Sequence, residues 1–192
     1  MKSFSFPQFV FGYHGCDRAV GEAVLLGKDT LRFSKNEYDW LGSGIYFFEN
    51  APLRALEWAR ACAENPKLTK GRITDPFVLG AIIDLGHCLN LTDMAQMEIL
   101  RTAYELVKES FERTGQPLPE NTEGNRKLDC LVINAIMNLN QLRKYGDFDT
   151  VRGAFIEGKI VYPGAQISDK THIQVCVRNP DSIHGFFYPT DL

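Results

Sequence analysis

The alternation of apolar and polar residues predicts strands near both ends of the chain and helices in its middle. Residues 8–15 are rich in aromatic and β-branched side chains, and a short apolar run occupies 44–48; both are typical of strands. A third run, 77–85, lies between a proline and a glycine and predicts a buried strand. Toward the C-terminus, strands are predicted at 152–156, 159–162, 171–177 and 185–188. We expect Glu157 and Gly158 to form the turn of a hairpin that joins the first two of these.

Apolar residues at helical spacing predict three helices. Asn50 is placed to cap the first, which is expected over 52–64 with Pro52 in its first turn. In the middle of the chain, a second helix is expected over 92–115, where a glycine ends it. A third is expected over 128–145 and is apolar almost all round, so it should pack against a sheet or another helix.

Strands at both ends with helices between them favour an α+β fold over an alternating βαβ fold. With 192 residues, the chain fits one domain spanning 1–192, and a chain of this length forms a hydrophobic core without disulfides or a metal. Hydrophobic residues make up 44% of the chain and charged residues 23%, which excludes a disordered protein. The net charge of −3 disfavours a protein coated by nucleic acid, although a local basic groove stays open.

The cysteines are too scattered to form a disulfide framework or a zinc site. There are five of them, and no pair has the Cys-x-x-Cys spacing. We therefore expect buried thiols in a reducing compartment, and no metal. Residues 1–7 lack the apolar stretch of a signal peptide, and no run approaches the ~18 apolar residues of a membrane helix. These features predict a cytoplasmic protein that does not bind membranes.

Several polar residues of the predicted strands are expected to have ordinary roles. His172 and His184 lie on late strands with no cysteine or carboxylate at metal-ligand spacing. Arg152 and Arg178 are expected to be solvated charges on the surface of strands. The glycines of 42–44 are too close together for a dinucleotide-binding glycine loop.

Two motifs in the first third of the chain point to a specific chemistry. His14 and Gly15 end the first predicted strand, and Gly-Ile-Tyr-Phe follows at 44–47, which places Tyr46 32 residues after His14. Trp58 lies 12 residues further on, in the predicted helix. In this order and spacing the chain resembles the ADP-ribosyltransferase superfamily, in its His-Tyr-Glu branch of diphtheria-toxin-like and poly(ADP-ribose) polymerase-like enzymes. The resemblance is good over the first third of the chain and loose over the last fifth.

This resemblance implies a split β-sheet sandwich around an NAD cleft, and the helical section at about 90–145 is an insertion that matches nothing in the family. NAD+ would be a substrate, its nicotinamide carboxamide bound by the backbone of Gly15, where a Cβ would obstruct approach. His14 would hydrogen-bond a ribose hydroxyl, and the rings of Tyr46 and Trp58 would stack on the nicotinamide. The residues implied in NAD binding are His14, Gly15, Ser43, Gly44, Tyr46 and Trp58.

The chain departs from the family at its catalytic carboxylate. The late predicted strand carries Gln174 where the family has glutamate. Glutamine can accept a hydrogen bond from the ribose 2′-OH, but it cannot supply the negative charge that stabilises the oxocarbenium ion formed as nicotinamide leaves. Glu157 lies 17 residues upstream, before the segment where the family recognises its acceptor, and is the candidate for a displaced acid or an acceptor contact. The implied catalytic residues are therefore His14, Tyr46, Gln174 and Glu157.

The resemblance predicts an enzyme that transfers one ADP-ribose from NAD+ to a macromolecular acceptor, either protein or nucleic acid. Such a compact, solitary domain suggests a bacterial or phage-related toxin or defence effector, which implies a neutralising antitoxin partner. Three different functions stay open: a catalytically silent module that binds NAD or ADP-ribose, an NAD-dependent enzyme similar to RNA 2′-phosphotransferases, and an interaction domain whose aromatic residues are all core. The missing carboxylate favours the silent module, whereas the phosphotransferase-like enzyme expects core arginines that the sequence does not place.

Overall fold

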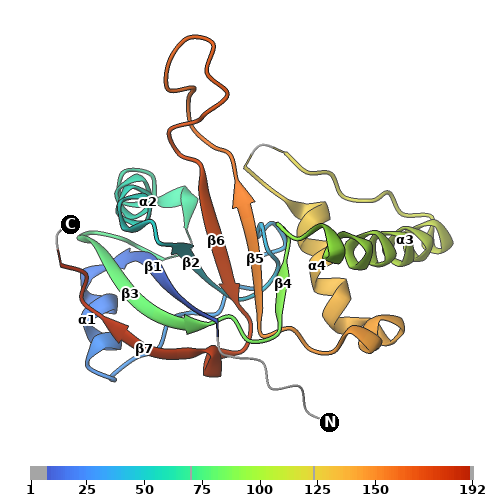
Figure 1. Ribbon diagram of the computed structural model, residues 1–192, viewed down its shortest axis with the longest axis horizontal. Helices are drawn as coiled ribbons and strands as arrows, with labels where there is room; N and C mark the ends of the chain where they lie inside the picture. The colour runs from blue at the N-terminus through green and yellow to red at the C-terminus, as the bar shows by residue number, and fades with distance from the viewer. Residues whose placement is uncertain (1–7, 70, 123, 191–192) are drawn as a thin grey trace.

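Within residues 8–69, 71–122 and 124–190, which the computed structural model describes, the chain forms one mixed sheet of seven strands (Figure 1). The predicted absence of a signal peptide concerns 1–7 and lies outside these residues. The strand order is β4-β5-β6-β2-β1-β3-β7, and neighbours are antiparallel except β4 and β5, which are parallel. The strands are β1 (Phe9–Asp17), β2 (Ile45–Glu49), β3 (Pro76–Asp84), β4 (Cys88–Asn90), β5 (Thr150–Phe155), β6 (His172–Val177) and β7 (Ile183–Phe187).

Two helices cover opposite faces of the sheet at β1 and β3, and two more lie toward the β4 edge (Figure 1). These are α1 (Arg18–Leu25), α2 (Pro52–Glu64), α3 (Met97–Thr114) and α4 (Lys127–Asn138). Three short 3-10 turns lie next to these helices, and a fourth lies between β6 and β7; they are η1 (Pro66–Leu68), η2 (Met94–Gln96), η3 (Asn140–Tyr145) and η4 (Pro180–Ser182). The predicted α+β class is confirmed. The α3–α4 section lies between β4 and β5, within the 90–145 segment that the sequence marks as helical.

Six of the seven predicted strands match the structure to within two residues at each end, but α1 and β4 were not predicted. Asp17 caps α1 by accepting a hydrogen bond from the Ala19 backbone N–H, 3.0 Å away. The predicted cap of α2 is wrong. Ala51 occupies the cap position without a side-chain bond, while Asn50 takes a left-handed φ of 50° and donates its backbone N–H to the Phe11 carbonyl. Asn50 therefore turns the chain out of β2 and does not cap the helix.

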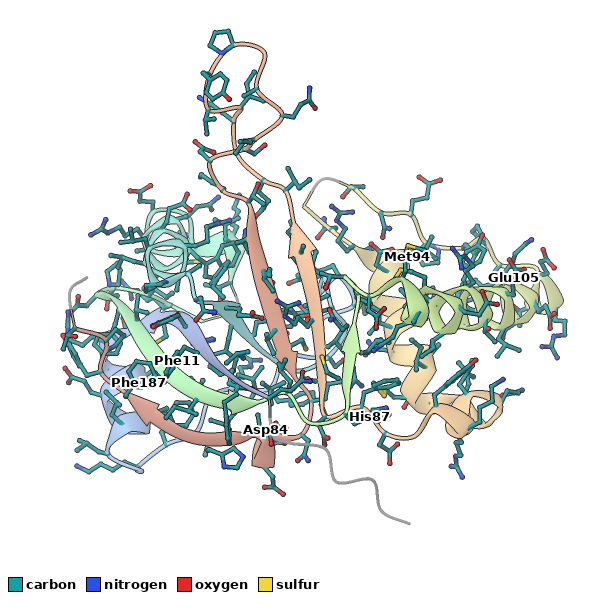
Figure 2. All side chains as sticks on the ribbon, in the orientation of Figure 1. Phe11, Asp84, His87, Met94, Glu105 and Phe187 are labelled. Atoms are coloured by element: carbon teal, nitrogen blue, oxygen red, sulfur yellow. The ribbon has the colours of Figure 1, made fainter. Side chains whose placement is uncertain are left out.

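The predicted strand at 159–162 and its tight hairpin are also wrong. β5 pairs directly with β6, and 156–171 forms a long loop that projects past the end of the sheet (Figure 1). Within the described part of this loop, strand-like pairing is limited to one bridge between Ile160 and Ser168. The apolar side chains of 160–162 are 48 to 59% exposed, since they have no sheet to pack against. Figure 2 shows this loop and its side chains standing clear of the rest of the molecule.

The sheet separates three apolar clusters that hold the helices in place, one on the α1 face and two on the opposite face, where one lies under α2 and one under α3 and α4. On one face, Leu79, Phe47 and Val175 form a buried cluster with Val24 of α1. On the other face, α3 and α4 pack over the β5–β6 half of the sheet, where Ile133 is a central buried residue. α4 ends at Asn138 and not near 145 as predicted. The backbone becomes extended directly after Asn138, and the separate 3-10 turn η3 continues the segment. At the other end of the sheet, Phe11 of β1 and Phe187 of β7 meet edge to face at 5.8 Å (Figure 2).

The sheet is nearly divided between β1 and β2. These strands share two residue pairs, Gly12 with Glu49 and Tyr13 with Phe48, whereas β1 and β3 share nine. Beyond Tyr13, β1 continues along β3 while the start of β2 stays with β6. We call the resulting gap, between 14–17 of β1 and 45–47 of β2, the fork. The sequence analysis expects two small sheets around a cleft; the structure instead has one hydrogen-bonded sheet that divides at the fork.

Candidate functional site

The backbone N–H and C=O groups of Gly15 point into the fork. The Phe11 carbonyl accepts from the Asn50 N–H across the β1–β2 boundary, so this residue directs its N–H and C=O toward β2. In an antiparallel strand every second residue directs its peptide groups to the same side, so Tyr13 and Gly15 do the same. Pairing with β2 ends at Tyr13. The N–H and C=O of Gly15 therefore point into the fork as a donor and an acceptor side by side.

Position 15 requires glycine because α2 packs directly on the strand. A Cβ at this position would lie 2.3 Å from the backbone oxygen of Ala55, which cannot move without displacing the helix. Ala55 and Ala59 keep this helix face small, and both are fully buried. The sequence analysis explains Gly15 by the approach of a ligand. The structure gives a second reason, the close packing of α2 against β1.

His14 reaches across the fork to the backbone of β2. Its Nδ1 lies 2.8 Å from the carbonyl oxygen of Tyr46. A carbonyl only accepts hydrogen bonds, so Nδ1 carries the proton and Nε2 of the neutral ring keeps a lone pair. Burial lowers the pKa of His14, which favours this neutral form. His14 therefore joins the two sides of the fork and offers a hydrogen-bond acceptor at Nε2.

Tyr46 lies on β2 with its hydroxyl group engaged by the loop that precedes the strand. The hydroxyl donates to the Gly42 carbonyl at 2.5 Å and accepts from the Leu41 N–H at 2.9 Å. Burial raises the pKa of Tyr46 well above its ordinary value. The hydroxyl thus remains protonated and is held by the backbone, which leaves the ring as the part of Tyr46 that could contact a ligand.

Ser43 and Gly44 complete this loop and are fixed from two sides. The Ser43 N–H donates to Oδ1 of Asn134, on α4, at 2.9 Å. A Cβ at position 44 would lie 2.3 Å from the Cys176 sulfur, so glycine allows the loop to pack on β6. Arg178 also donates to Asn134 Oδ1, at 3.1 Å. Arg178 is partly buried, and burial lowers its pKa, so the predicted solvated surface charge is wrong.

Gln174 lies on the same face of the sheet as Tyr46 and forms a hydrogen-bonded pair with His172. The β2–β6 register places Gln174 opposite Phe48 and two residues from Cys176, the partner of Tyr46. Gln174 Nε2 is 2.9 Å from His172 Nε2. His172, whose side chain is 1% exposed, is held at its other nitrogen by the Lys170 carbonyl, 2.7 Å away. The sequence analysis did not assign His172 to the site.

Four charged side chains border this pair and balance one another. Arg54 of α2 binds Glu157 through Nη2 at 2.6 Å and Glu57 through Nη1 at 2.7 Å. Lys170 also contacts Glu57. Glu157 Oε2 lies 3.7 Å from His172 Nδ1, so the predicted displaced acid is close to the Gln174 side of the site. Its charge is paired with Arg54, which packs over the Phe48 ring at 5.2 Å.

The candidate residues do not all project from one face. Gly12 and Cys16, the neighbours of His14 at alternate positions, meet the apolar cluster of α1, whereas Tyr46 and Gln174 lie on the opposite face. His14, Tyr46 and Gln174 nevertheless all lie around β2, because the His14 side chain binds the backbone of that strand. Trp58 is 37% exposed on α2, and no contact between its ring and Tyr46 is recorded among the described residues.

The predicted surface role of Arg152 is also wrong. Its side chain is 18% exposed and makes a two-pronged ion pair with Glu49, at 2.6 and 2.9 Å. This pair joins β5 to β2 across β6, and it raises the pKa of Arg152. Of the site residues that were not predicted, Arg54 had one local signal, its position in the first turn of the helix that follows Tyr46. Asn134 had none, since Ser43 and Arg178 are distant from it in sequence. His172 had a local signal, because Gln174 lies two residues along the same strand and therefore on the same face.

Neither a metal site nor a membrane span is found among the described residues. No group of three or more His, Cys, Asp or Glu side chains there could hold a metal ion. In the same part of the chain, every helix is too short or too polar to cross a membrane. The thiols of Cys16, Cys62 and Cys130 are buried, and burial raises the pKa of each to about 11.

Comparisons with known proteins leave the family open. The chain is similar to an uncharacterized protein of Methanocaldococcus jannaschii, with 26% identity over 190 residues, covering 89% of this chain and 83% of the relative. No family model and no solved structure matches the chain.

Proposed function

We propose that the protein is a mono-ADP-ribosyltransferase that uses NAD+ as donor and modifies a macromolecule. The observation that carries this proposal is the fork, which the peptide groups of Gly15 face and which the His14 side chain crosses to the backbone of β2. The resemblance of the sequence to the His-Tyr-Glu branch supports the same assignment, since its motifs at 14–15 and 44–47 are the residues that line the fork. The fork would then be the NAD cleft of an ADP-ribosyltransferase fold.

The nicotinamide end of NAD+ fits the donor and acceptor of Gly15. A carboxamide offers one N–H donor and one carbonyl acceptor in the same plane, which complements a strand's N–H and C=O pair. The ring of Tyr46, and Trp58 if it turns toward the fork, would stack on the nicotinamide for about 1 kcal/mol each beyond burial. His14 Nε2 would accept a hydrogen bond from a ribose hydroxyl of the adenosine half.

The reaction breaks the bond between ribose C1′ and the nicotinamide nitrogen. The electron pair of that bond leaves with nicotinamide, which becomes neutral, and an acceptor nucleophile then forms a bond to C1′ and loses its proton. Gln174 Oε1 would accept from the ribose 2′-OH and hold the sugar in place. Because Glu157 is paired with Arg54, it does not offer a free carboxylate to the ribose, so we expect slow transfer of a single ADP-ribose and no chain elongation.

The same charge pairing favours a second candidate, a catalytically silent module that binds NAD or ADP-ribose. Both candidates predict NAD+ binding at the fork, and they differ only in whether nicotinamide is released. The acceptor would be a protein or a nucleic acid, and a role as a toxin or defence effector would require a neutralising partner. Neither a phosphotransferase-like enzyme nor a pure interaction domain gains support from the geometry of the fork.

The test is nicotinamide release from NAD+ by the purified protein, with cell lysate as the source of acceptor. We expect slow release that falls about tenfold or more in Gln174→Ala. Gln141→Ala is the matched control, because Gln141 is exposed in η3. NAD+ binding without release would establish the silent module, and a lack of NAD+ binding would refute both candidates.

A further inference from the structure

The side-chain amide of Gln174 can lie in two orientations that differ in chemistry but hardly in shape. In one, Oε1 faces the space beside β2 and Nε2 faces His172; in the other, these two atoms are exchanged. Only the first presents a hydrogen-bond acceptor to a ribose hydroxyl through Oε1 with the amide N–H groups turned away. The activity of a site that uses glutamine in place of a carboxylate therefore depends on what fixes this orientation.

The surroundings of His172 fix its proton on one nitrogen. Nδ1 lies 2.7 Å from the Lys170 carbonyl oxygen, which can only accept, so Nδ1 is the protonated nitrogen. The ring is closely enclosed by Phe48, at 5.0 Å between centroids, and Phe155, at 5.9 Å. A ring held in this way cannot turn to exchange its nitrogens without breaking the Lys170 bond. In the neutral state, Nε2 therefore has a lone pair directed at Gln174.

The lone pair selects one orientation of the amide. Gln174 Nε2 at 2.9 Å donates to it, whereas Oε1 in the same place would oppose one lone pair with another. Protonation of His172 reverses the preference, because both ring nitrogens then donate and only Oε1 can face the ring. We propose that His172 is a positioning residue that sets the orientation of the Gln174 amide, so that Gln174 presents Oε1 to the ribose only while His172 is neutral.

Burial, and not the charged groups around it, keeps the His172 ring neutral at physiological pH. From α2, Arg54 and Glu57 face it, and from the β5–β6 loop, Glu157 and Lys170 do so. Their charges cancel in pairs, so burial of the ring is the largest influence, and it lowers the pKa of His172. Protonation would therefore occur only in acid below the ordinary histidine range near 6.5. The consequence for catalysis rests on the transferase function proposed above, but the amide orientation does not.

The first measurement needs no substitution. A two-bond 1H–15N spectrum of the 15N-labelled protein at about pH 7.5, one unit above the ordinary histidine pKa, reports which ring nitrogen is protonated. We expect His172 to show a proton on Nδ1 and a bare Nε2. On acidification, the Gln174 side-chain amide signals should shift together with the His172 ring signals. A proton on Nε2 at this pH, or amide signals that ignore the ring titration, would overturn the proposal.

The second measurement uses His172→Phe, with the exposed His184→Phe as control. We expect His172→Phe to move the Gln174 amide signals, to lower kcat for nicotinamide release about tenfold with little change in KM for NAD+, and to remove the acid limb of the pH profile. Unchanged amide signals in a folded His172→Phe protein would refute the positioning role. If the wild-type protein releases no nicotinamide, the transferase proposal fails, while the spectra still decide the amide orientation.

Discussion

His14 and His172 are two buried histidines that are held in the same way and differ at one atom. In each ring Nδ1 donates to a backbone carbonyl, that of Tyr46 at 2.8 Å or that of Lys170 at 2.7 Å, and burial lowers the pKa. At Nε2 of His172, Gln174 supplies the hydrogen bond. At Nε2 of His14, no protein partner is recorded within the described residues. The acceptor of His172 thus binds Gln174, whereas the acceptor of His14 is the atom that the proposed function assigns to a ligand.

The two surroundings also differ in how they are built. His14 lies where two strands separate, and one backbone contact ties it to β2. His172 lies within the paired part of the sheet, under a network of one arginine, one lysine and two carboxylates. The difference teaches that contacts of the main chain form the fork, whereas contacts between charged side chains form the surroundings of Gln174. Substitutions should therefore damage the first through packing and the second through charge.

The largest effect is expected from Gly15→Ala, which attacks the packing of the fork. The new Cβ would lie 2.3 Å from the Ala55 oxygen, so α2 must move away from β1. We expect a loss of about 3 kcal/mol in the free energy of unfolding, measured by urea denaturation, together with loss of NAD+ binding. Gly185→Ala is the control, since a Cβ there meets nothing within 4 Å. Equal stability of the two variants would contradict the close packing of α2.

The next effect is expected from Gln174→Glu, which changes charge on the other side. A carboxylate only accepts hydrogen bonds, so His172 would have to protonate Nε2 and its pKa would rise. The added negative charge near the ribose should raise nicotinamide release roughly tenfold, with the histidine cation offsetting part of the gain. The rate and the His172 ring signals are measured together. Gln141→Glu adds the same charge at an exposed site, and it should leave the rate of nicotinamide release and the His172 ring signals unchanged.

A smaller effect is expected from Trp58→Ala, which tests whether the exposed indole serves the fork. Trp58 is 37% exposed, so its removal should change stability by less than about 1 kcal/mol. If the indole stacks on nicotinamide, KM for NAD+ rises about fivefold, equivalent to ~1 kcal/mol of stacking. Leu53→Ala, 69% exposed on the same helix, is the control. An unchanged KM would remove Trp58 from the site.

The smallest difference is expected in the dependence of stability on pH. The pKa values of His14 and His172 are both lowered in the folded protein. At a pH between the lowered and the ordinary pKa values, the unfolded chain therefore binds more protons than the folded protein does. The stability due to the neutral rings is complete above about pH 6.5 and is lost as the pH falls toward the lowered values. His14→Phe and His172→Phe should each flatten this slope in urea titrations. A slope that neither variant changes would mean that other groups cause it.

The sequence predicted features that depend on neighbouring residues, and it missed most features that depend on contacts between distant parts of the chain. The strands and the motifs at 14–15 and 44–47 were recognised because each depends on neighbouring residues, and the structure places them on both sides of the fork. The 159–162 strand failed because alternation alone does not reveal whether a partner strand exists. Helix α1 was missed, although Asp17 offers a cap, because its eight residues follow a strand without a break.

The contacts that hold the candidate site could not be predicted. Arg54 and Glu157 are 103 positions apart, as are Arg152 and Glu49, and Ser43 lies 91 positions from Asn134. Their pairing depends on the strand order and on which face each residue takes. The role of Gly15 in packing α2 was equally hidden, because glycine has no side chain whose chemistry could suggest a partner.

Because β1 and β2 share only two residue pairs, a rotation of one half of the sheet relative to the other would change the width of the fork. The joined end, at 12–13, is a pivot, and the peptide groups of Gly15 lie two residues, about 7 Å, along one arm from Tyr13. Displacement grows with distance from a pivot, so a small rotation of one half of the sheet opens or closes the gap most at its free end. The β1–β2 register places Tyr46 opposite Gly15, so the His14 contact to the Tyr46 carbonyl crosses the two arms at this level and limits that rotation. Among the described strands, the two halves of the sheet are least joined by backbone pairing at this boundary, which is also where the peptide groups of Gly15 face the gap.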